Sequence, residues 1–245
     1  LREALHTLLA DDPRTLVLGE DILDPYGGAF KVTQGLSSRF PDRVLTTPIS
    51  EAAIVGMSVG LALRGRRPIA EIMFGDFVAL AADQLINHAA KYAAMYNGEV
   101  SVPLVVRAPM GGGRGYGPTH SQSLERLFLG IPHLRVLAAS HVHDAGALLQ
   151  AAVADHAPVL FVENKLLYPL RLERGSASIT RDETPDSHGY PVVTLRNYGA
   201  GEAPDVTVIA YGGMSRLLVP LLERLADEEI RLLACLPACI SPLDT

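Results

Sequence analysis

The sequence contains little cysteine, no excess of basic residues and no long apolar run. Its two cysteines, Cys235 and Cys239, lie four residues apart, which argues against a disulfide framework or a metal site. A net charge of −6 provides no basic stripe for the phosphates of a nucleic acid. Gly, Arg or Asp interrupts each apolar run before it reaches membrane-spanning length. We therefore expect a cytoplasmic protein that binds neither nucleic acid nor membrane.

Several catalytic motifs are also missing. There is no G-x-S-x-G element and no histidine spacing that suits zinc. The glycine-rich residues 111–118 follow a predicted strand, but no Lys-Ser/Thr pair comes after the glycines, so a P-loop is not expected.

Apolar segments of strand and helix type alternate along most of the chain. Strands are expected over residues 15–18, 43–46, 68–73, 102–107, 136–139 and 159–163. Helices are expected over residues 1–12, 31–40, 51–64, 78–96 and 145–154. This order predicts an α/β domain over residues 1–175, with a mostly parallel sheet in three layers.

The composition changes after this domain. Residues 176–204 are rich in charge, Pro, Gly and Ser, and we expect them to form a linker. Residues 205–245 predict a second α/β unit, with a strand over 206–211, a helix over 215–227 and a strand over 230–236. Because so short a unit cannot bury a core alone, we expect the chain to be truncated at its C-terminus.

The segment Thr46–Glu51 places a carboxylate at the start of an apolar helix. Ser50 is a suitable N-cap, and Glu51 in the first turn complements the helix dipole. Residues 52–63 carry no charge, which predicts a helix covered on most faces. From these residues alone, Glu51 is either a helix cap or a catalytic group.

Four other positions have two interpretations each. His120, beside the glycine-rich loop and before a predicted helix, is structural or an acid/base group. Phe77, at a strand end with Phe74, is a core residue or faces a flat ring. Glu20, after a strand, lies in a ligand site or a solvated loop. Asp155 is a loop acid or an oxygen ligand of a hard cation.

Taken together, five motifs resemble one family. They are Gly19-Glu20-Asp21, Thr47-Pro48-Ile49-Ser50-Glu51, Arg67-Pro68, Asp83-Gln84 with Asn87, and His120-Ser121-Gln122. Their order and spacing resemble the beta subunit of thiamine-dependent 2-oxo acid dehydrogenases, the decarboxylating component of pyruvate, branched-chain 2-oxo acid and acetoin dehydrogenase complexes. The resemblance implies a transketolase-type pyrimidine-binding domain, followed by the start of a transketolase C-terminal domain.

The resemblance also implies roles for site residues. Glu51 would hydrogen-bond a ring nitrogen of the aminopyrimidine of thiamine diphosphate, and His120 would assist transfer of the acyl group to a lipoyl arm. Phe77 would pack against the aminopyrimidine, and Met73 and Ile49 would line the same pocket. Glu20 would be a second acid, near a tunnel that joins two active sites.

Metals and partners follow from the same resemblance. Leu104, Ala152 and Asp155 fall on positions that hold a structural potassium ion in the family. The family's diphosphate and magnesium motif, Gly-Asp-Gly followed by Asn, is absent from this sequence. We therefore expect magnesium to be held by an alpha partner, in an α2β2 heterotetramer with a beta–beta dimer that serves a lipoyl-bearing acyltransferase.

Two alternatives remain at this stage. The chain could be half of a split transketolase-like enzyme that acts on sugar phosphates, or a non-catalytic assembly subunit. The loop around Arg114 is richer in glycine than expected for pyruvate enzymes, so the sequence leaves open which 2-oxo acid is the substrate.

Overall fold

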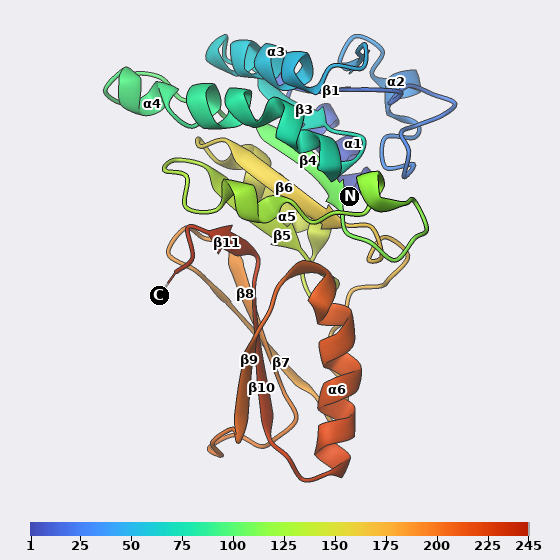
Figure 1. Ribbon diagram of the computed structural model, residues 1–245, viewed down its shortest axis with the longest axis vertical. Coiled ribbons are helices and arrows are strands. Elements are labelled where there is room, and N and C mark those ends of the chain that lie inside the picture. The colour runs from blue at the N-terminus through green and yellow to red at the C-terminus, as the bar shows by residue number, and fades with distance from the viewer. Residues whose placement is uncertain (245) are drawn as a thin grey trace.

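The computed structural model describes residues 1–244, which contain two β-sheets (Figure 1). The larger sheet has seven strands in the order β11-β5-β6-β4-β3-β1-β2. All its neighbouring strands are parallel except the β11–β5 pair. The strands are β1 (Thr15–Gly19), β2 (Val44–Thr46), β3 (Arg67–Glu71), β4 (Val105–Met110), β5 (Arg135–Ala139), β6 (Val159–Asn164) and β11 (Cys239–Ser241).

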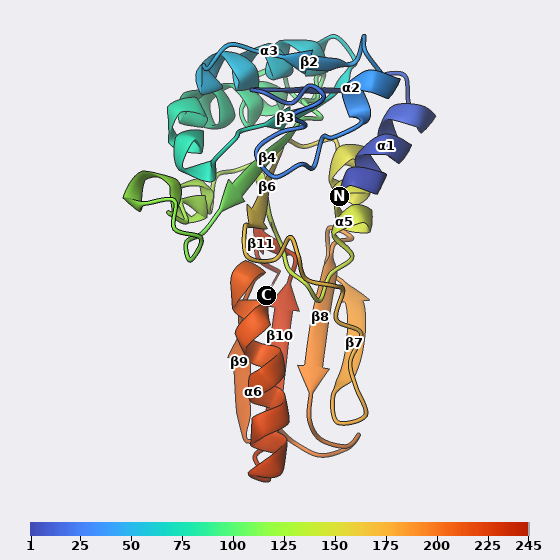
Figure 2. The ribbon, with the colours of Figure 1, turned by 90° about the vertical axis from the view of Figure 1, so that its right-hand side faces the viewer.

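Helical segments cover both faces of this sheet and make it the middle of three layers. On one face, α3 and the segments after β3 enclose a core with the side chains of Ala70, Val106 and Leu160. On the other, α1 and α5 enclose a second core with Ile69 and Phe161, and Figure 2 shows these two helices side by side. The predicted mostly parallel α/β sheet is therefore confirmed.

The helical segments differ widely in length. They are α1 (Arg2–Asp11), α2 (Leu36–Arg39), α3 (Glu51–Leu63), η1 (Gly75–Ala81), η2 (Gln84–Ala89), α4 (Tyr92–Met95), η3 (Pro118–His120), η4 (Glu125–Phe128), α5 (Ala145–Ala154), η5 (Gly212–Met214) and α6 (Ser215–Asp227). Within residues 1–244, no helix combines the length and the apolar character that crossing a membrane requires.

The smaller sheet has four strands in the order β7-β8-β10-β9. They are β7 (Thr180–Pro185), β8 (Pro191–Arg196), β9 (Val206–Ile209) and β10 (Leu232–Pro237). Figure 2 shows α6 along one face of this sheet, and Leu218 and Leu222 of α6 pack there against Val193 and Leu195. After β10 the chain returns to the larger sheet as β11, which pairs with β5 and ties the two units together.

The segment expected to be a linker differs from that prediction. Residues 176–204 contain β7 and β8, which form an antiparallel pair in the smaller sheet. The reason is that β7 is an exposed edge strand with the sequence TRDETP, so it lacks the apolar alternation that identifies a strand. Its backbone hydrogen bonds to β8 stabilise it instead.

Two predicted helices are also revised. Over 31–40, only Leu36–Arg39 is helical, because Lys31 and Gly35 have left-handed backbone angles and Asp24 accepts hydrogen bonds from Gly35 and Ser38. Over 78–96, the single long helix is replaced by a 3₁₀ segment, a π segment and a short α-helix. The buried positions still follow helical spacing there, so periodicity identified the segment and missed its hydrogen-bond pattern.

A fully buried ion cluster lies in the middle of the larger sheet. Arg107 of β4 donates to Glu71 of β3 at 2.5 Å and to Glu163 of β6 at 2.6 and 2.8 Å. The hydroxyl of Tyr168 donates to Glu163 at 2.6 Å. Burial raises the pKa of Glu71, whereas the two carboxylates hold the pKa of Arg107 above its ordinary value despite burial. Three neighbouring strands are thus joined by charge as well as by their backbones.

We predict that Arg107→Met lowers the free energy of unfolding by about 3–5 kcal/mol, because it leaves two buried carboxylates without their cation. Urea denaturation followed by circular dichroism measures the loss. Arg231→Met, which breaks the exposed pair with Asp205, is the matched control and should cost about 0–1 kcal/mol. Equal stability of the Arg107→Met variant and the wild type would show that the cluster does not stabilise the sheet.

Candidate functional site

Glu51 is a buried carboxylate at the first position of α3. Its side chain is 7% exposed, and Ser50 occupies the N-cap position with an extended backbone but without a side-chain capping bond. Within residues 1–244, the Glu51 carboxylate makes no hydrogen bond, yet its oxygens are not among the fully buried polar atoms that lack a partner. Although the residue is buried, its carboxylate oxygens are therefore accessible to a group from outside the chain.

The helix behind Glu51 is covered on most faces, as its composition predicts, but one side is open. Ile54, Val55 and Val59 face the core, whereas Met57 is 51% exposed, and Ala53 and Gly60 are exposed on the same side. An apolar helix with an open face is typical of a surface that a partner covers.

Glu20, directly after β1, is the second acid near Glu51. Burial raises the pKa of Glu20, and the negative charges of Asp21 and Glu51 raise it further. The parallel register of β1 with β2 places the ends of both strands at one edge of the sheet, and Glu51 follows β2 after four residues. Two of the sequence-predicted site residues are therefore brought together.

An aromatic wall forms at the end of the neighbouring strand β3. The ring of His120 meets Phe74 edge-on at 4.7 Å between centroids and Phe77 edge-on at 5.2 Å. Gly75 allows this turn, because a Cβ atom there would lie 2.2 Å from the side chain of Met110. Phe74 and Phe77 are only partly buried, so the wall has faces that are open to a ligand.

The loop that carries His120 is held by hydrogen bonds from three directions. Thr119 Oγ1 lies 2.9 Å from His120 Nδ1. Oδ1 of the buried Asp76 accepts from the backbone N–H of Gln122 at 2.9 Å and from its side-chain amide at 3.0 Å. The ammonium of Lys165 donates to the carbonyl oxygen of His120. His120 is followed by the 3₁₀ turn η4 rather than by the expected helix.

The two remaining pocket residues are more loosely placed. Met73 is half-buried beside Phe74, at the end of β3. Ile49 precedes α3 and is 77% exposed, so it contributes to a pocket only if another chain closes over it.

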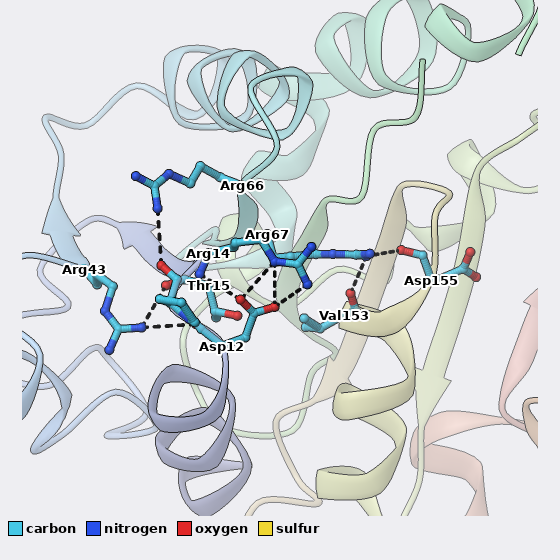
Figure 3. A network of polar contacts seen from close by, with 9 residues as sticks. Asp12, Arg14, Thr15, Arg43, Arg66, Arg67, Val153 and Asp155 are labelled. Atoms are coloured by element: carbon cyan, nitrogen blue, oxygen red, sulfur yellow. Dashed lines mark hydrogen bonds and ion pairs between the residues drawn. The ribbon is translucent and has the colours of Figure 1, made fainter. Parts of the chain in front are cut away.

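A network of arginines lies at the opposite end of the strands (Figure 3). Arg67 Nη1 donates to the carbonyl oxygens of Val153 at 2.8 Å and Asp155 at 2.7 Å, at the C-terminal end of α5. Helix C-termini favour such a cation. Arg14 pairs with Asp12 in the same network.

The residues expected to hold potassium lie beside this network. The carbonyl of Leu104 accepts from the backbone of Val159 at 2.7 Å, and Ala152 is buried in the last turn of α5. Burial would raise the pKa of Asp155, but hydrogen bonds from Ala157, Tyr190 and Arg135 hold it below its ordinary value. The carboxylate and carbonyl oxygens of Asp155 accept hydrogen bonds, and Arg67 supplies a positive charge there. The assignment of potassium to these residues stays a prediction.

Sequence reasoning missed two residues of the site. Lys165 follows β6 and carries no motif, although a lysine directly after a buried strand is a signal that could have been weighed. Asp76 lies between two phenylalanines in the sequence, and its bonds to Gln122, 46 residues away, could not be read locally.

Comparison with known proteins gives consistent relationships. Residues 1–171 match the family described as transketolase, pyrimidine binding domain. The chain is 42% identical over 221 residues to the 2-oxoisovalerate dehydrogenase subunit beta of Bacillus subtilis, covering 89% of this chain and 64% of that protein. It is 36% identical to the acetoin:2,6-dichlorophenolindophenol oxidoreductase subunit beta of Cupriavidus necator, over 100% of this chain and 72% of that protein. A mitochondrial pyruvate dehydrogenase E1 component subunit beta-1 of Arabidopsis thaliana is also 36% identical, over 100% of this chain and 65% of that protein.

Solved structures show the same fold. A structure described as split gene transketolase, inactive beta4 tetramer, superimposes with a TM-score of 0.69 at 22% identity, covering 99% of this chain and 70% of that one. Transketolase from Leishmania mexicana gives a TM-score of 0.63 at 18% identity, covering 98% of this chain and 34% of that one. The chain spans about two thirds of the length of these sequence relatives: 64% of the Bacillus protein, 65% of the Arabidopsis protein and 72% of the Cupriavidus protein.

The raised pKa of Glu20 leads to a prediction about pH and stability. A carboxyl group whose pKa is higher in the folded protein costs stability when it is ionised, and this cost disappears below the pKa of the unfolded chain. Glu20→Gln should therefore raise Tm at pH 7, and the gain should fade as the pH approaches about 4. Glu99→Gln, at an exposed position, should show no gain. A lower Tm for Glu20→Gln at pH 7 would contradict the assignment.

Proposed function

The chain belongs to the transketolase pyrimidine-binding domain family, with the beta subunits of thiamine-dependent 2-oxo acid dehydrogenases, and from this premise we propose that it supplies the aminopyrimidine half of a decarboxylating active site. The carboxylate of Glu51, a buried residue whose carboxylate oxygens make no hydrogen bond within residues 1–244 and remain accessible, carries the proposal. A carboxylate at the N-terminus of a helix that packs against η1, the segment with Phe77, suits a flat ring with a basic nitrogen.

The residues of the site fit the aminopyrimidine of thiamine diphosphate. The orphan carboxylate of Glu51 would hold a proton shared with a ring nitrogen, and Phe77 would offer a partly open aromatic face to the ring. When bound, the cofactor would supply the nucleophile and the electron sink that decarboxylation of a 2-oxo acid needs. Burial, with smaller contributions from the charges of Asp21 and Glu51, raises the pKa of Glu20, so a second acid lies near Glu51 at this edge of the sheet.

His120 is the proposed acid/base group for the later step. Its ring is fixed by Phe74 and Phe77, and it lies on a loop at the end of the strands. From there it would donate a proton as the acyl group passes to a lipoyl arm of an acyltransferase. Met73 would line the pocket, and Ile49 would do so once a partner covers it.

The proposal requires a second chain. The sequence has no Gly-Asp-Gly, and residues 1–244 contain no cluster of three or more His, Cys, Asp or Glu that could hold a metal. The diphosphate and magnesium are therefore assigned to an alpha subunit. Exposed apolar side chains on α3 and η1, among them Met57, Leu63 and Leu80, offer it and a second beta chain a surface to cover. Potassium has no part in this proposal and stays a prediction.

The decisive preparation is the chain co-purified with an alpha subunit that carries the Gly-Asp-Gly motif followed by Asn. With thiamine diphosphate and magnesium, the complex should release CO₂ from pyruvate or 3-methyl-2-oxobutanoate. The transketolase-like alternative, favoured only by fold, predicts ketol transfer between sugar phosphates instead. A complex that assembles and does neither would be an assembly subunit.

We predict that Glu51→Gln in this complex lowers kcat by about 10²-fold or more, because the amide cannot share the proton that the carboxylate holds. Size-exclusion chromatography should show an unchanged assembly. Glu99→Gln serves as the control and should retain wild-type turnover. Wild-type-like turnover of the Glu51→Gln complex would reject the role assigned to Glu51.

A further inference from the structure

Lys165 is a buried lysine that the proposed chemistry has not used. It follows β6 directly, and its side chain is 0% exposed. A lysine is almost never buried to this degree unless its charge is paired. Burial lowers the pKa of Lys165, and the charge of Asp76 opposes that effect.

The ammonium of Lys165 lies among aromatic rings and points at the loop that carries His120. It is 5.1 Å from the ring centroid of Phe74 and 5.6 Å from that of Tyr116, both within the range of cation–π attraction. Its hydrogen bond goes to the carbonyl oxygen of His120. Phe74 therefore contacts both the ammonium and, edge-on, the imidazole of His120.

The backbone of Lys165 binds the start and the middle of the glycine-rich loop. Its N–H donates to the carbonyl of Met110 at 3.0 Å, where β4 ends and the loop begins. Its carbonyl accepts from Arg114 Nη1 at 3.1 Å, in the middle of the loop. Lys165, the residue directly after β6, thus binds the loop at Met110, Arg114 and His120.

Asp76 supplies a charge of opposite sign at the same loop. Its Oδ1 accepts the two hydrogen bonds from Gln122, whereas its Oδ2 is buried and has no partner. Residues 120–122 are therefore bound at His120 by the ammonium of Lys165 and at Gln122 by the carboxylate of Asp76. Two buried residues of opposite charge thus hold this part of the loop.

We propose that Lys165 is the positioning residue for His120: its ammonium fixes the main chain of His120 and so holds the imidazole against Phe74 and Phe77. That Lys165 positions His120 follows from the contacts alone. That this positioning matters for catalysis rests on the function proposed above for His120. Without the ammonium, the imidazole loses its fixed direction, and misplacement by about 1 Å can cost about 10²-fold in rate.

The test uses the alpha–beta complex with Lys165→Met, His120→Ala and the double variant. Methionine keeps an unbranched apolar stem between the rings and removes the donors. Lys165→Met should lower kcat for acyl transfer to a lipoyl acceptor by about 10²-fold, with KM for the 2-oxo acid changed by less than about threefold. In the His120→Ala background, Lys165→Met should have almost no further effect, because it acts through the imidazole.

A second measurement does not depend on turnover. Trypsin cleavage after the exposed Arg114 reports how often the loop opens, and it should be about tenfold faster in the Lys165→Met complex. Lys91→Met, at an exposed lysine that bonds Asn87, is the matched control and should match the wild type in both measurements.

The two assays separate the two proposals. If the wild-type complex decarboxylates neither 2-oxo acid, the proposed function fails, and the cleavage assay still tests the anchor. Losses that multiply in the double variant, or a cleavage rate equal to that of the wild type, would overturn the role of Lys165.

Discussion

The guanidinium of Arg107 lies between Glu71 and Glu163 in the middle of the larger sheet, and it joins the three strands whose ends carry most of the site. Phe74 and Phe77 follow β3, the glycine-rich loop follows β4, and Lys165 follows β6. Because these strands are parallel neighbours, their carboxyl ends meet at one edge, and the ion cluster fixes the strands beneath it. A carboxylate on a buried residue or an edge-on aromatic contact is useful only on such a rigid base.

The contacts continue from the cluster to the site through aromatic side chains. Tyr168 donates to Glu163 and stacks on Phe30 at 5.2 Å between centroids, and Phe30 meets Phe74 at 5.5 Å. Phe74 then contacts His120. Rigidity at the proposed acid/base group is therefore built from the same packed rings that shape the pocket wall.

Much of the fold could be predicted from the sequence, because buried parallel strands are short apolar runs that end in polar residues. The same rule failed for β7, whose exposed edge carries charged side chains, and for the bonding pattern of residues 78–96. Glu51 and His120 could be singled out by their motifs. Lys165 and Asp76 could not, because their roles depend on contacts with residues about 45 positions away.

The central claim is that this chain holds half of a cofactor site. It presents an unpartnered carboxylate on a buried residue and an aromatic wall, but no motif for the diphosphate. Equilibrium dialysis with labelled thiamine diphosphate and magnesium tests this directly, using the chain alone, the alpha subunit alone and their mixture at equal concentrations. The account predicts tight retention of the cofactor only in the mixture. Equally tight binding by the isolated chain would contradict it.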